Sequence, residues 1–144
     1  GSQKEALQKK VVKSKILNIE FLDVPDGKVP KIQDMADVML LPIKKGAASS
    51  SIPSKLPAYM FSKKPIIASV DLNSDSAKAI NEANAGWVIE PENIEVFKNA
   101  MKEAALLDKN ELDLKGENGF NYAMNNLSKK NNLQQVVNVI LESI

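Results

Sequence analysis

Short apolar runs alternate with longer amphipathic segments through the middle of the chain. The runs VMLLPI (38–43), PIIASV (65–70) and GWVIE (86–90) have the length of strands, and the first two are apolar on both faces. Strands of this kind are typical of a parallel sheet that is covered by helices. The pattern therefore predicts an α/β fold with a parallel sheet and flanking helices.

The segments between these strands have the spacing of helices. Leu56, Tyr59 and Met60 share one helix face, and Ser74 is a suitable N-cap for the segment SDSAKAINEAN. Another helix follows the last strand. Its residues at core-facing spacing are Ile94, Phe97, Met101 and Ala104.

Both ends of the chain add further elements. The segment QKEALQKKVVKSK predicts a helix, ILNIEFLD (16–23) has the length of a strand, and KIQDMAD predicts about two helical turns. Asp108 and Glu111 have the spacing of a capping box at the start of a penultimate helix. A last helix is predicted to place four apolar residues on one side: Leu133, Val136, Val137 and Ile140. We expect one domain over residues 1–144, with the last two helices packing across the sheet or reaching toward another domain.

The composition limits the chemistry that the chain can perform. The 144 residues include no Cys and no His, which removes disulfides, thiolate nucleophiles, histidine bases and the usual zinc ligands. With 19 Lys and Arg against 18 Asp and Glu, the net charge of +1 does not favour binding to nucleic acid. Because the N-terminal segment has no apolar region typical of a signal peptide, the predicted location is cytoplasmic.

The loop that follows VMLLPI is the candidate ligand-binding segment. In open parallel sheets, ligands bind beyond the carboxyl ends of the strands, which is where this loop lies. Gly46 allows a ligand to approach the backbone closely, and Ser50 and Ser51 add hydroxyl groups beside their amides.

The helix after this loop should begin close to the same edge. Pro57 is tolerated only in the first turn of a helix, which places the helix start near Pro53 or Ser54, with Lys55 in the first turn. Unpaired amides, the positive end of the helix dipole and a Lys favour an anion. The predicted ligand is a phosphate or diphosphate, although loops of similar composition also occur where nothing binds.

Three carboxylates lie near the same predicted edge. Asp71 follows the strand 65–70, Asp75 lies in the first turn of the next helix, and Glu90 ends the strand 86–90. We interpret them as a turn residue, a first-turn acid and a solvated carboxylate, rather than as ligands of a sugar or nucleoside.

The motif SIPSKLPAYM, followed by KPIIAS, resembles the donor-binding, C-terminal domain of GT-B glycosyltransferases of family 4. The resemblance covers the chain from about Gly1 to Ile144 and is greatest to bacterial enzymes of capsule, O-antigen and exopolysaccharide biosynthesis, including the N-acetylfucosaminyltransferase group. It implies a Rossmann-like domain that binds a nucleotide sugar, with UDP as the expected nucleotide, and no metal or other cofactor. It also implies that Ser50, Ser51, Ser54 and Lys55 hold the diphosphate.

The chain departs from the family pattern in ways that bear on activity. Ala58 and Ser50 stand where many members carry a pair of Glu residues, which leaves the catalytic residues unknown. The first two strands of the donor domain and the whole acceptor domain are absent. In the family strand order 3-2-1-4-5-6, a gap would then separate 16–23 from 38–43. We expect the chain alone not to catalyse transfer, and an exposed sheet edge to favour self-association.

The resemblance leaves the reaction and the acceptor open. The leading hypothesis is sugar transfer to a lipid-linked or polysaccharide precursor, with any peripheral membrane association made through the missing domain. A sugar-nucleotide 2-epimerase would share the architecture, and a non-catalytic interaction module would agree with the absent Glu pair.

Overall fold

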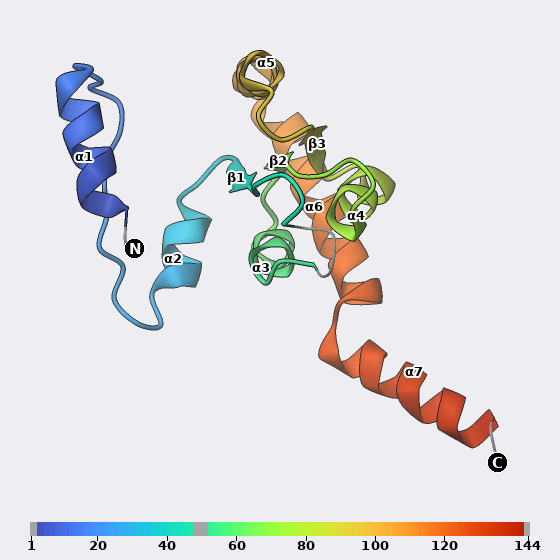
Figure 1. Ribbon diagram of the computed structural model, residues 1–144. Helices are drawn as coiled ribbons and strands as arrows, with labels where there is room; N and C mark the ends of the chain where they lie inside the picture. Colours follow the sequence, from blue (N-terminus) through green and yellow to red (C-terminus); the bar gives the residue numbers. More distant parts are fainter. Residues whose placement is uncertain (1–2, 48–51, 143–144) are drawn as a thin grey trace.

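The computed structural model describes residues 3–47 and 52–142, and the description of α7 omits the side chains of residues 130, 135, 136 and 142. The described chain contains a small parallel sheet with helices on both faces (Figure 1). Its elements, in order, are α1 (Lys4–Lys13), α2 (Val29–Asp34), β1 (Met39–Pro42), α3 (Lys55–Phe61), β2 (Ile66–Ser69), α4 (Asp75–Ala83), β3 (Gly86–Ile89), α5 (Ile94–Leu106), α6 (Lys109–Asn126) and α7 (Lys129–Glu142). The predicted α/β class with a parallel sheet and flanking helices is confirmed.

The sheet has the strand order β1-β2-β3, and both pairs are parallel. Met39 pairs with Ile66, which in turn pairs with Gly86, so the three strands begin and end level with one another. Helices α3 and α4 connect neighbouring strands. The loops that leave the carboxyl ends of the strands therefore meet along one edge.

Two apolar cores lie on opposite faces of the sheet. Leu56 and Met60 of α3 and Ile80 of α4 are fully buried against one face, where α6 crosses both helices (Figure 1). On the other face, Ile67 packs with Ala104 and the rest of the inner side of α5. The sheet is thus the middle layer of the fold, and burial on both faces explains the continuous apolar run of β2, whereas Leu40 and Pro42 of the edge strand β1 remain exposed.

Local sequence signals set several helix boundaries as predicted. The side chain of Ser74 accepts a hydrogen bond from the amide of Ala77 at the start of α4. At the start of α6, Asp108 accepts from the amide of Glu111, and the Glu111 carboxylate accepts from the amide of Asp108. The predicted N-cap and capping box are therefore confirmed.

Three predictions about secondary structure need correction. The segment 16–23 forms no strand, because it has no neighbouring strand to pair with. Helix α2 begins at Val29, with Pro30 in its first turn, rather than at Lys31. Ile94 and Met101 of α5 are 77% and 45% exposed, because the side of α5 that faces the sheet is the one with small residues.

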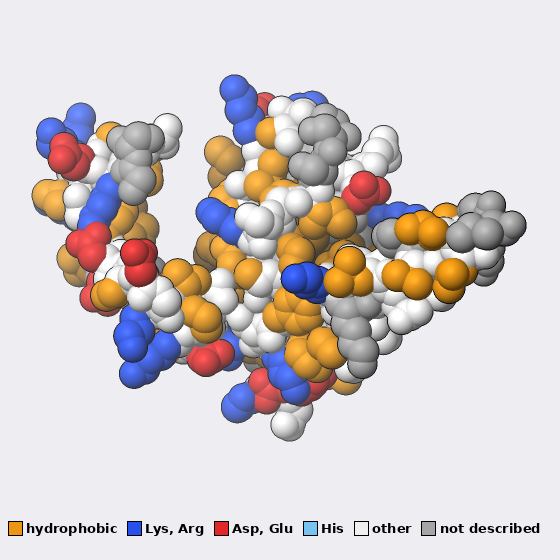
Figure 2. Space-filling view, turned by 90° about the horizontal axis from the view of Figure 1, so that it is seen from below, with side chains coloured by type: hydrophobic (Ala, Val, Ile, Leu, Met, Phe, Trp, Pro, Cys, Tyr) orange, Lys and Arg blue, Asp and Glu red, His pale blue; other side chains and the backbone are white. Residues whose placement is uncertain are grey.

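The two ends of the described chain extend away from the sheet. Helices α1 and α2 bury none of their residues, and α7 projects beyond α6 (Figure 1). Apolar side chains are visible on the projecting α7 in Figure 2, in agreement with the exposure of Leu133, Val137 and Ile140. None of the helices in the described part of the chain has the length and apolar character needed to cross a membrane.

Candidate functional site

The candidate site is the edge of the sheet at which the three strands end. Pro42, Ser69 and Ile89 are the last residues of β1, β2 and β3, and the loops to α3, α4 and α5 start there. Parallel strands bring loops that are distant in sequence to one edge, which is where ligands of open α/β sheets bind. Ser50 and Ser51, two of the predicted site residues, lie outside the described residues.

Gly46 and Asp71 connect the loops that follow β1 and β2. The amide of Gly46 donates a hydrogen bond of 2.9 Å to Oδ2 of Asp71. Gly46 has a φ of +77°, a conformation that glycine adopts without strain. The predicted role of Gly46 was to give a ligand close access to the backbone, yet its amide is engaged by Asp71. The loop is thereby held over the end of β2.

Lys45 and Glu90 connect the loops that follow β1 and β3. The ammonium of Lys45 lies 3.5 Å from Oε1 of Glu90, and both side chains are more than half exposed. An exposed pair of this kind adds little stability, but it places a cation above the sheet edge. Lys45 was not among the site residues predicted from the sequence; its position three residues after the end of β1 was the available signal.

Ser54 and Lys55 lie at the start of α3, as the position of Pro57 predicted. Lys55 is the first residue of the helix, and Pro57 is the third, where a missing amide proton is tolerated. The backbone of Ser54 is already helical, and its side chain makes no capping hydrogen bond. Both residues are exposed, so the hydroxyl of Ser54 and the ammonium of Lys55 are accessible to a solute at this edge.

A small cavity lies on the α5 side of the same edge. It has a volume of about 210 Å³, and its lining consists of Pro42, Ser69, Glu92, Asn93, Ile94 and Phe97. Sites for drug-sized ligands span roughly 300–1,000 Å³, so the cavity is too small for a whole nucleotide sugar. The arrangement suits a ligand that lies along the open edge and inserts only one group.

Neither a metal site nor a similar known protein indicates which ligand this edge of the sheet would bind. The described residues contain no group of three or more metal-binding side chains. No family model, curated protein or solved structure matches the chain. The resemblance to glycosyltransferases therefore stays a prediction, and the candidate site depends on its geometry.

The hydrogen bond between Gly46 and Asp71 can be tested by substitution. We expect Asp71→Ala to speed hydrogen exchange at the Gly46 amide and to lower the free energy of unfolding by about 1 kcal/mol. Asp71→Asn keeps an acceptor oxygen, so exchange should remain slower than in the alanine variant. Amide exchange measured by NMR compares the three proteins. Equal exchange rates in all of them would mean that Asp71 does not hold the loop.

Proposed function

We propose that the chain binds the diphosphate of a nucleotide sugar at the carboxyl edge of the sheet and is the donor-binding part of a glycosyltransferase. The proposed donor is a UDP-sugar, and the proposed acceptor is a precursor of a surface polysaccharide. We also propose that the protein is cytoplasmic, as predicted from the sequence. In this proposal, the acceptor and any contact with the membrane depend on a second domain.

The observation that carries the proposal is the convergence of three loops at one sheet edge beside the start of α3. Lys45 and Lys55 come from opposite ends of the loop that Asp71 holds through Gly46. Two cations and a helix start are a suitable environment for an anion with two phosphate groups. Glu90 and Asp71 neutralise part of this charge, which leaves Lys55 as the principal cation for the ligand.

The chemistry that this edge can support is stabilisation of a leaving group. In sugar transfer, the bond between the anomeric carbon and the β-phosphate oxygen breaks, and the anomeric carbon bonds to the oxygen of an acceptor hydroxyl, whose proton passes to the departing phosphate or to solvent. Negative charge accumulates on the departing nucleoside diphosphate. The Lys55 ammonium and the Ser54 hydroxyl would stabilise that charge through hydrogen bonds.

The decisive experiment is a calorimetric titration of the chain with UDP, beside Lys55→Ala. We expect the variant to bind UDP about tenfold more weakly, because a hydrogen bond to a charged group is worth about 1.5–3 kcal/mol. Lys109→Ala is the matched control. Lys109 is also the first residue of its helix, but it lies near Pro65, at the opposite edge of the sheet.

Other outcomes of the titration have distinct meanings. Equal weakening in Lys55→Ala and Lys109→Ala would indicate nonspecific attraction of the anion. No binding of UDP or any other nucleoside diphosphate would contradict the proposal and favour the interaction module. Product analysis with the complete enzyme separates transfer, which releases the nucleoside diphosphate, from epimerisation, which retains it.

A further inference from the structure

Strand β1 is an edge strand with an open side. Among the described residues it pairs only with β2, and the amides of Met39 and Ile43 donate to the carbonyls of Pro65 and Ser69. Because donors alternate along a strand, the amide and carbonyl of Leu40 point toward the open side. Pro42 has no amide proton, so the region that can pair with another strand is short.

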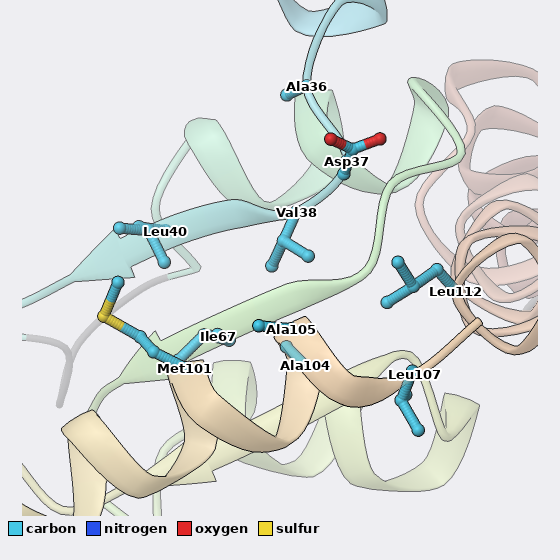
Figure 3. A pocket seen from close by; sticks show the side chains of 10 residues that line it. All are labelled: Ala36, Asp37, Val38, Leu40, Ile67, Met101, Ala104, Ala105, Leu107 and Leu112. Carbon is cyan, nitrogen blue, oxygen red and sulfur yellow. The ribbon is translucent and has the colours of Figure 1, made fainter. Parts of the chain in front are cut away.

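An apolar groove lies beside this open edge, on the α5 face of the sheet. It has a volume of about 480 Å³ (Figure 3). Leu40 of β1 lies on one side of it and Met101 of α5 on the other, with Val38 and Leu112 farther along. Leu40 is 42% exposed and Met101 is 45% exposed. A strand added to β1 would cover these side chains with its own inward-facing residues.

The N-terminal arm, residues 3–28, contains a segment with the matching pattern. In ILNIEFLD, the residues Leu17, Ile19 and Phe21 alternate with the polar Asn18 and Glu20, as in a strand with one buried face. Yet Leu17 is 97% exposed and Ile19 is 49% exposed, because the arm extends away from the sheet (Figure 1). An ion pair between Lys4 and Asp23 joins the start of α1 to the end of this segment.

We propose that the chain forms a dimer in which the segment 16–23 of each copy adds to the open edge of β1 in the other. The added strand would run parallel to β1 and place its apolar side chains in the groove. Such an exchange of identical segments is a common route to a symmetric dimer. This proposal does not rest on nucleotide binding, because the open edge of β1 and the groove beside α5 carry it.

Side-chain direction and charge together define the pairing. Placing Ile19 beside Leu40 puts Leu17 beside Val38 and Phe21 beside Pro42, all on the face of the groove. A parallel strand in this register places Asp23 beside Lys44, two residues of opposite charge. An antiparallel strand with Ile19 beside Leu40 would instead place Lys15 beside Lys44, two residues of like charge.

The connection between the arm and the core favours exchange between two copies. Helix α2 is held to the end of α3, since Ser62 donates to Gln33 and Lys64 donates to the carbonyl of Asp34. The chain before α2 contains Pro25, which disfavours a helical conformation at Val24, and the segment 16–23 lies away from its own sheet (Figure 1). In this arrangement the open edge of β1 is left for the segment of a second copy.

Analytical ultracentrifugation of the chain over a concentration series tests the proposal. We expect a dimer, and we expect Ile19→Asp to raise its dissociation constant at least about tenfold, because the variant would bury a carboxylate in an apolar groove. Asn18→Asp is the matched control and should leave the constant within about threefold, since it adds the same charge on the polar face. Ile19 contacts no part of the described core, so both variants should fold; the near-ultraviolet circular dichroism checks this.

Thiol cross-linking determines which copy supplies the strand, because the chain contains no cysteine. A ¹⁵N-labelled Ile19→Cys chain is mixed with an unlabelled Leu40→Cys chain and treated with a short bismaleimide. We expect mass spectrometry to find labelled residue 19 joined to unlabelled residue 40, and far less product with Asn18→Cys. A chain that stays monomeric at every concentration would overturn the proposal. So would a double Ile19→Cys/Leu40→Cys variant that cross-links only within one chain.

Discussion

Replacing Gly116 by alanine is expected to lower the free energy of unfolding by about 3 kcal/mol, which is severe for a domain of this size. Gly116 lies where α6 crosses the turn between α3 and β2. A Cβ atom there would lie 2.1 Å from the carbonyl oxygen of Lys63 and 2.6 Å from its carbonyl carbon. Either α6 or the turn must then move.

The turn at Lys63 has little freedom to move. The ammonium of Lys63 forms an ion pair of 2.7 Å with Glu117 and lies 4.6 Å from the centre of the Phe120 ring. Both partners are on α6. The backbone of Lys63 has a φ of +55°, which lies in the small left-handed region of allowed conformations. The turn therefore cannot easily adopt a different backbone geometry. The roughly 1 kcal/mol that alanine gains over glycine in a helix offsets only part of the clash.

Chemical denaturation followed by the fluorescence of Trp87 measures this effect. Gly119→Ala provides a graded comparison. Its Cβ would lie 3.1 Å from the Cβ of Ala85 and 3.5 Å from the Cγ of Met60, so the substitution should be tolerated better. Asn121→Ala, at an exposed site of the same helix, should leave stability within about 0.5 kcal/mol. Stability of Gly116→Ala equal to that of Asn121→Ala would mean that α6 does not lie against this turn.

The second large effect is expected for Gly86→Ala, which should lower the free energy of unfolding by about 3 kcal/mol or more. Gly86 begins β3 and pairs with Ile66 in the central strand. A Cβ atom at Gly86 would lie 1.9 Å from the carbonyl oxygen of Ile66, and the φ of +156° adds strain. Relief of the clash requires β3 to separate from β2.

Gly46→Ala is the control that separates the effect of backbone strain from the effect of the clash at Gly86. Gly46 has a φ of +77°, but no atom of the described residues lies within 4 Å of the Cβ that alanine would add. Its substitution should therefore destabilise the protein by only about 1–2 kcal/mol. Hydrogen exchange at the amides of β2 and β3 provides the local measurement. Equal losses in Gly86→Ala and Gly46→Ala would show that strain, and not the clash at the sheet, dominates.

The strands and helices of the central region could be predicted because their signals are local. The apolar runs of 38–43, 65–70 and 86–90 each contain one strand of the sheet. The position of Pro57 predicted the start of α3, because a proline is compatible with a helix only in its first turn. Such rules depend on neighbouring residues alone, so they apply before any tertiary contact is known.

The contacts at the candidate site could not be predicted in this way. Lys45 meets Glu90, 45 residues away, and the amide of Gly46 meets Asp71, 25 residues away. The apolar pattern predicted parallel strands, but both contacts also require the strands to lie level with one another in the order β1-β2-β3, which the pattern does not specify. Asp71 was interpreted as a turn residue and Glu90 as a solvated carboxylate. In the structure, Asp71 holds the loop through the amide of Gly46, and Glu90 forms an exposed ion pair with Lys45.

The sequence by itself determined the α/β class, the three strands, the capped helices and the start of α3, because proline positions, caps and apolar periodicity act locally. Only the tertiary structure decided that 16–23 stays out of the sheet, since a strand forms only beside a partner. It also decided which glycines are indispensable: Gly116 and Gly86 lie where backbone meets backbone, and that proximity exists only once the layers have packed.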